Sequence, residues 1–182
     1  MAKLPILARA RRRLVLTTGR FARAESGATA VEFALVAIPF LTLIFALIEL
    51  GLVLTVSLSL ESAVIDVGRT IRTGEAQMAG TSATAFKTAV CNKMLPIGGN
   101  CATSLQIDVQ TFADYATTNT ANDGTTPQTM TWRPGVPGSV VLIRAYYTWP
   151  LITPLLQTGL QSSSGKRVLY AATAFTNEPY DQ

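Results

Sequence analysis

The feature that most constrains this chain is an uninterrupted apolar run, Phe33 to Leu60. It contains 28 residues, of which only Glu49 is charged. About 20 apolar residues in a helix are enough to cross the hydrocarbon core of a bilayer. The alternative is a buried core helix, but a domain of this size cannot enclose so long an apolar helix on every side. The run therefore predicts a membrane-spanning helix.

The charge that precedes this run predicts its orientation. Residues 1–27 hold seven Lys and Arg residues and one acid, whereas the rest of the chain holds eight basic and ten acidic residues. The positive-inside rule then predicts a cytoplasmic leader, with the remainder of the chain outside the membrane. Two alternatives are disfavoured. A basic tail can bind nucleic acid, but the apolar run that follows explains the basic charge better as the cytoplasmic flank of a membrane span. A cleaved secretory signal has an apolar region of only about 7–15 residues, and this run of 28 residues is too long for one.

A helical pattern continues beyond the apolar run. Six apolar residues recur at spacings of three and four, which is the period of one helix face: Val53, Val56, Leu60, Val64, Val67 and Ile71. Gly74 follows as a C-terminal cap. We therefore predict one helix over residues 28–73, kinked or loosened at Pro39 and Gly51. Its first half suits lipid, and its second half presents a narrow apolar seam to a domain or a partner.

Residues 74–182 carry the patterns of a small α+β domain. A helix capped by Thr81 is expected from Ala83 to about Leu95, and residues 113–138 are expected to form a loop. Three strands are predicted by alternating or continuous apolar patterns: Leu105–Gln110, Ser139–Thr148 and Val168–Thr176. The second is apolar on both faces, which predicts a central strand. The expected fold is a long transmembrane helix continuing into a small extracytoplasmic head with a second short helix and an antiparallel sheet of about three strands.

The composition argues against catalysis. The chain has no histidine, so it lacks the commonest general base and metal ligand, and its two cysteines are too few for a Cys-only zinc site or an iron–sulfur cluster. It also has no Gly-rich phosphate motif and no G-x-S-x-G elbow. We expect no enzyme, no cofactor, no metal, no small-molecule substrate and no nucleic-acid partner.

The two cysteines, Cys91 and Cys101, lie ten positions apart on the side predicted to be extracytoplasmic. An oxidising compartment favours a disulfide between them. The alternative is two unrelated thiols. A redox site usually has the C-x-x-C spacing, which this chain lacks.

The acidic residues are expected to be structural or solvated. Those scattered through the head are expected on the solvated surface: Asp108, Asp114, Asp123 and Asp181. Asp66 and Arg69 are spaced to pair with each other on the helix surface. Glu49 stands about 25 Å beyond Glu32 along a helix, near the outer interface. It is either a snorkelling or interface-level acid or a polar contact to the helix of another subunit.

The junction before the apolar run has a distinctive pattern. Residues 25–33, ESGATAVEF, follow a basic leader and place a glutamate five positions after a glycine, then an aromatic residue and the long apolar helix. This pattern resembles the leader of a class III prepilin. The stretch GATAVEFALVAIPFLTLIFALIELG, its continuation through Arg69, and the later PGSVV and YTWPL are similar to TadE-like (TadE/TadF) pseudopilins of the Tad tight-adherence pilus system.

This resemblance implies a role and a set of sites. In that family an inner-membrane prepilin peptidase cuts after the glycine, which implies cleavage between Gly27 and Ala28. Glu32 then becomes the fifth mature residue, and the resemblance implies that it pairs with the Ala28 amine of a neighbouring subunit. The implied protein is a minor pseudopilin that takes part in assembly of a Tad/Flp-type (type IV-like) pilus. Its implied partners are the prepilin peptidase, other pilins and pseudopilins, and Tad assembly proteins.

Topology and resemblance together predict three regions. These are a basic cytoplasmic leader at 1–27, a transmembrane and stem helix at 28–73, and an extracytoplasmic head at 74–182. The implied location is the bacterial inner membrane, with a single pass, a periplasmic head, and pilus or surface association after processing. The alternative function is an uncleaved single-pass anchor whose periplasmic head binds an envelope partner.

Overall fold

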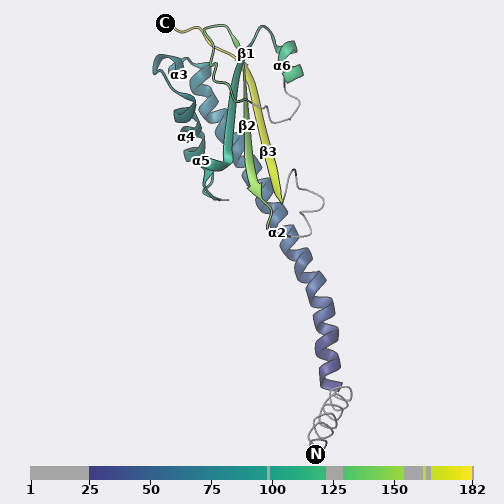
Figure 1. Ribbon diagram of the computed structural model, residues 1–182. Coiled ribbons are helices and arrows are strands. Elements are labelled where there is room, and N and C mark those ends of the chain that lie inside the picture. The colour runs from purple at the N-terminus through teal and green to yellow at the C-terminus, as the bar shows by residue number, and fades with distance from the viewer. Residues whose placement is uncertain (1–24, 98, 122–128, 154–161, 163–164, 182) are drawn as a thin grey trace, which may run out of the picture. The chain divides into compact units, whose positions relative to one another are not determined.

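The structure is a computed structural model of the chain, and it describes residues 25–97, 99–121, 129–153, 162 and 165–181 (Figure 1). The described elements are, in chain order, α2 (Glu25–Arg72), α3 (Glu75–Met78), α4 (Ala83–Lys93), α5 (Cys101–Ser104), β1 (Leu105–Phe112), α6 (Tyr115–Ala121), β2 (Val140–Pro150) and β3 (Lys166–Thr176). The chain divides into two units, Met1–Phe45 and Ala46–Gln182, which are described in turn.

The described part of the first unit is the N-terminal stretch of α2. Ile44 is half-buried, and the other large apolar side chains are about half exposed or more: Val31, Phe33, Leu35, Val36, Ile38, Phe40, Leu41, Leu43 and Phe45. Pro39 lies inside this helix, in agreement with the single helix predicted over residues 28–73. Apolar side chains on every side of a helix are unfavourable in water, so this stretch requires a nonaqueous surrounding.

In the second unit a three-stranded antiparallel sheet has the order β1-β2-β3. Leu105 of β1 lies opposite Tyr147 of β2, and Val140 of β2 lies opposite Thr176 of β3. The central strand is buried without a break over residues 140–147. Its β-branched and aromatic side chains suit a pleated strand that is covered on both faces. The predicted α+β class and the central position of this strand are confirmed.

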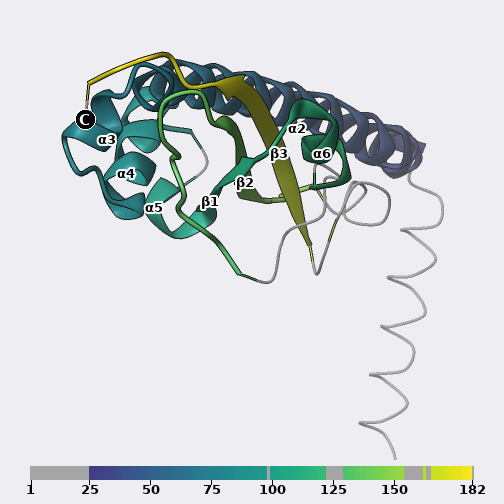
Figure 2. The same ribbon diagram turned by 90° about the horizontal axis from the view of Figure 1, so that it is seen from above.

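The core of this unit lies between α2 and one face of the sheet (Figure 1, Figure 2). All six predicted seam residues of α2, from Val53 to Ile71, are buried, and none is more than 6% exposed. Full burial of a side chain of this size contributes about 1.5–3 kcal/mol. The helix approaches the sheet closely at Gly68, where an added Cβ would lie 3.0 Å from Cδ1 of Ile143.

The end of α2 is fixed by the predicted glycine. Gly74 has a φ of +82°, a left-handed conformation that favours glycine. Its backbone N–H donates to the carbonyl of Ile71 at 3.2 Å, and the N–H of Glu178 donates to the carbonyl of Arg72 at 2.8 Å. A Cβ at Gly74 would lie 2.3 Å from Cγ of Tyr180. The C-terminal segment therefore packs directly over the helix end.

Two local predictions are wrong. The cap of α4 is Ser82 rather than Thr81, because the Ser82 hydroxyl accepts the backbone N–H of Ala85 at 3.2 Å. The region 113–138 is not wholly a loop, since α6 begins there after Asp114. The Asp114 carboxylate accepts the backbone N–H of Thr117 at 2.8 Å, a contact that offsets the weak helix propensity of the threonines that follow. The sequence also predicts an irregular or short helical connection from Pro150 to Leu160, and residues 154–160 of it lie outside the described residues.

Candidate functional site

The residues of the predicted processing site lie in the first turns of α2. The helix begins at Glu25, so the Gly27–Ala28 peptide bond is inside it. Residues 27–32 are exposed, and an added Cβ at Gly27 would meet nothing within 4 Å. This bond is accessible, but the helix must open locally before a peptidase can hold it in an extended form.

Glu32 is exposed, and it lies on the same helix face as Ala28, which precedes it by four positions. Three ion pairs occur among the described residues, and none of them includes Glu32. Its carboxylate is thus available to a group from outside the described part of the chain.

Glu49 has hydrogen-bond partners that the sequence does not predict. It is 3% exposed, and its carboxylate accepts the backbone N–H groups of Ile152 at 2.5 Å and Thr153 at 2.6 Å. The partners of this acid therefore belong to its own chain, so a snorkelling side chain and a contact to another helix are both wrong, whereas its level near the outer interface stays a prediction. No local pattern indicates this contact, because the partners are 103 and 104 positions away along the chain. We call these three residues the Glu49 clamp.

Asp108 was expected on the surface and is fully buried at 0% exposure. It lies opposite Arg144 in the β1–β2 register, and the guanidinium donates to it from Nη2 at 2.7 Å and from Nε at 3.1 Å. The backbone N–H and hydroxyl of Thr131 also donate to it, at 2.8 and 2.6 Å. The acid therefore joins two strands and holds the segment that returns along β1. An arginine inside an otherwise apolar strand was the signal that could have predicted a buried partner.

The protonation states of Asp108 and Arg144 follow from their burial and their hydrogen bonds. Burial opposes ionisation of Asp108, but hydrogen bonds from Thr131, Arg144 and Gln110 outweigh it and lower its pKa. Burial also disfavours the charged form of Arg144, but the hydrogen bond to Asp108 outweighs this and raises the pKa of Arg144. Both groups are therefore charged at neutral pH. The pair is a structural element, because its donors and acceptors are directed at each other.

The predicted pairing of Asp66 with Arg69 is also corrected. Asp66 instead forms an ion pair with Lys93 of α4 at 2.8 Å, and Arg69 acts on it only as a nearby charge. The backbone N–H of Leu95 donates to the hydroxyl of Ser59 at 2.9 Å. These two contacts join the end of α4 to α2.

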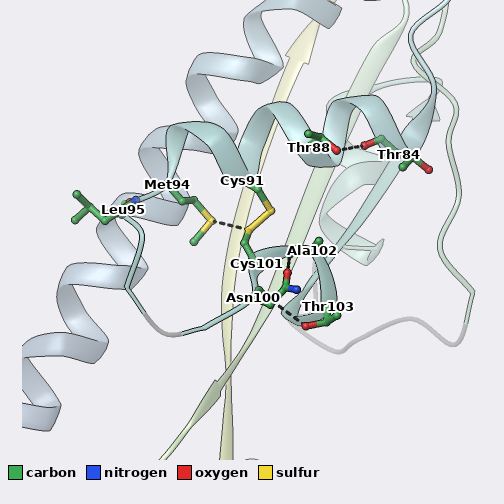
Figure 3. Close-up of a disulfide and its surroundings, with 10 residues drawn as sticks. Thr84, Thr88, Cys91, Met94, Leu95, Asn100, Cys101, Ala102 and Thr103 are labelled. Carbon is green, nitrogen blue, oxygen red and sulfur yellow. Dashed lines mark hydrogen bonds between the residues drawn. A yellow bond between two sulfur atoms is a disulfide. The ribbon is translucent and has the colours of Figure 1, made fainter.

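Cys91 in α4 and Cys101 at the start of α5 form a disulfide, with Cα atoms 5.7 Å apart (Figure 3). The Sγ of Cys101 lies 3.9 Å from the Sδ of Met94. A hollow of about 590 Å³ adjoins the bridge, and Lys87 is the single charged residue among its described lining residues. No group of three or more His, Cys, Asp or Glu residues in the described part of the chain is placed to hold a metal ion.

The structure defines a class of protein in which a long apolar helix leads into a small α+β head. Among the described residues, one helix, Gly27–Arg72, has the length and apolar composition to cross a membrane, with a mean hydropathy of 2.5 in its most apolar window. Only 6% of that window is buried, which does not fit a core helix and is consistent with a membrane anchor.

The comparisons with known proteins agree with this class. A family model described as TadE-like protein matches residues 27–69, so the TadE-like resemblance inferred from the sequence is confirmed over these residues. Neither a curated protein nor a solved structure matches the chain. The match includes Gly27, Glu32 and Glu49, whereas the sheet, Asp108 and the disulfide lie beyond it.

Proposed function

We propose that this chain is a minor pseudopilin, a structural component in the assembly of a Tad/Flp-type pilus. The observation that carries the proposal is that the TadE-like match begins at Gly27 and includes the stretch of apolar helix up to Phe45, most of whose large side chains are exposed. The role is packing rather than catalysis. The helix resides in the inner membrane with its basic leader in the cytoplasm, and the head lies in the periplasm.

Processing and assembly follow from the first turns of α2. A prepilin peptidase removes residues 1–27 by cutting between Gly27 and Ala28, which creates a new α-amine. Glu32 then accepts the Ala28 amine of a neighbouring subunit and sets the axial register between helices. The exposed position of both residues supports this pairing. Both charges lie at the cytoplasmic edge of the span, where the cost is below the roughly 2.5–3.5 kcal/mol of a charge at the bilayer centre, and a partner for each charge reduces it further.

The test is the intact mass of the chain extracted from membranes of cells that contain a Tad system. Loss of residues 1–27 supports the pseudopilin. A full-length mass in cells where another pilin is processed rejects it and favours the uncleaved single-pass anchor. Gly27→Val is the matched control, and it should remain full length in both cases.

A further inference from the structure

The three-stranded sheet has two outer edges, one along β1 and one along β3 (Figure 1). The outer edge of a strand presents backbone N–H and C=O groups that another strand can pair with, and folded proteins usually cover or charge such an edge. The centre of the β1 edge is covered by the returning segment. The N–H of Val109 donates to the carbonyl of Thr131 at 3.0 Å, and the carbonyl of Val109 accepts the N–H of Arg133 at 2.9 Å.

The first part of the β3 edge is also covered. The N–H of Ser162 donates to the carbonyl of Lys166 at 2.8 Å, and the Ser162 hydroxyl accepts the N–H of Val168 at 3.2 Å. The even-numbered residues of β3 therefore direct their backbone groups away from β2. The register agrees, because the odd-numbered Asn177, which follows β3, donates its N–H to the carbonyl of Ser139 on the β2 side at 2.9 Å.

The last part of the β3 edge, residues 172–176, is open. Among the described residues, no hydrogen-bond partner is found for the outward N–H and C=O groups of Ala172, Ala174 and Thr176. This stretch contains neither proline nor a charged residue, and Ala174 and Thr176 are exposed. It therefore lacks the features that prevent a strand edge from pairing with another chain.

A hollow of about 510 Å³ lies between this open edge and α2. Its apolar lining includes Phe175 of β3 and Ile65 of α2, and Ile65 is 54% exposed. Three charged residues of α2 also line it: Asp66, Arg69 and Arg72. Asp66 and Arg72 have ion-pair partners elsewhere in the head, whereas Arg69 is exposed and takes part in none of the three ion pairs of the described residues.

We propose that residues 172–176 form a docking edge, to which an extended segment of another protein adds as a fourth strand of the sheet. Alternate side chains of a strand point to the same face, so every second side chain of the added segment enters the hollow. An apolar side chain there contacts Ile65 and Phe175, and an acidic side chain pairs with Arg69. Backbone hydrogen bonds then provide affinity, and the alternating side chains provide specificity.

The described strands of a second copy of this chain do not have this chemistry. β2 and β3 contain no acidic residue, and the acid of β1, Asp108, is buried in its ion pair with Arg144. The docking edge is therefore assigned to a different protein. The inference concerns the head alone and requires neither cleavage of the leader nor membrane insertion, so it and the proposed function can fail separately.

The first experiment measures amide hydrogen exchange by NMR on the full chain in detergent micelles, without any partner. The N–H groups of Ala172 and Ala174 should exchange rapidly, and those of Thr173 and Phe175, which point to β2, should exchange slowly. Slow exchange at all four positions would overturn the inference, because the edge would already be occupied. Dependence of that protection on protein concentration would identify a second copy as the occupant, and independence would identify a segment of the same chain.

The second experiment adds a probe, a short synthetic peptide of alternating valine and threonine in which one valine is replaced by glutamate. The peptide should slow exchange at Ala172 and Ala174. Arg69→Glu should weaken its binding by roughly threefold or more, and should favour a matched peptide that carries lysine in place of the glutamate. Failure of the glutamate peptide to slow this exchange, or an unchanged preference in Arg69→Glu, would overturn the inference.

Proline substitutions test the backbone pairing. Ala174→Pro removes an N–H that points away from β2, so it should keep the urea midpoint of the parent and abolish peptide binding. The matched control is Ala171→Pro, which removes an N–H that points to β2 and should lower the midpoint. Parental binding of the glutamate peptide by Ala174→Pro would contradict strand addition at this edge.

Discussion

Replacement of Arg144 by methionine tests the buried pair that organises the sheet. The change leaves the Asp108 carboxylate buried with its largest partner removed, although Thr131 and Gln110 still donate to it. Breaking a buried ion pair by removing one partner costs about 3–5 kcal/mol, and the remaining donors place the expected loss near 3 kcal/mol. That is a large part of the stability of a small domain.

The assay is urea unfolding of the full chain in detergent micelles. Tryptophan fluorescence reports on the head alone, because the two tryptophans of the chain, Trp132 and Trp149, both lie there. The control is the double variant Asp108→Leu/Arg144→Met, which removes both charges. It should recover part of the loss, because no unpaired charge stays buried and the donors of Thr131 and Gln110 that lose their acceptor are neutral groups, each at about 1–3 kcal/mol.

The pH dependence of the parent provides a further check. The folded-state pKa of Asp108 is lowered, so its contribution to stability is fully present above the unfolded-state value of about 3.9 and is lost as pH falls through the folded-state value. The double variant should lose less stability over this acidic range. Our reasoning is refuted if Arg144→Met unfolds at the same urea concentration as the parent, or if the double variant is no more stable than the single one.

Four further outcomes are expected. Gly27→Val should remain full length by mass, because a Cβ crowds the peptidase site; normal trimming would show that the cut is elsewhere. Glu32→Gln should be cleaved but fail to cross-link to neighbouring subunits or to assemble, and parental assembly would refute the charge pairing. Thiol labelling without reductant should find neither Cys91 nor Cys101 free, and replacement of both by serine should cost roughly 2–3 kcal/mol for a loop of this length; quantitative labelling of both would exclude the bridge. Glu49→Leu should lower the urea midpoint, since each buried N–H left without an acceptor costs about 1–3 kcal/mol, whereas an unchanged midpoint would show that the clamp is dispensable.

The sequence predicted the helices and strands whose burial follows from a local periodicity of apolar residues. The seam from Val53 to Ile71 repeats at the helical period, and β2 is apolar at successive positions, so both elements and their burial could be derived without a structure. The environments of Glu49 and Asp108 could not be derived in this way. Asp108 falls on the polar side of an alternating strand, and that pattern assigns it to solvent unless the returning segment at Thr131 is known. Both acids are satisfied by groups far away in sequence, which no periodicity encodes.

The seam also has a consequence for biosynthesis. Its six apolar residues are covered only when β1, β2 and β3 have assembled, and β3 ends at Thr176. At about 5–20 residues per second, a ribosome needs roughly 5–20 s to extend the chain from Ile71 to that point. Throughout this interval the seam is synthesised but uncovered. During this interval the seam is an exposed apolar surface, which favours association with other chains, and a product truncated before Lys166 keeps it exposed.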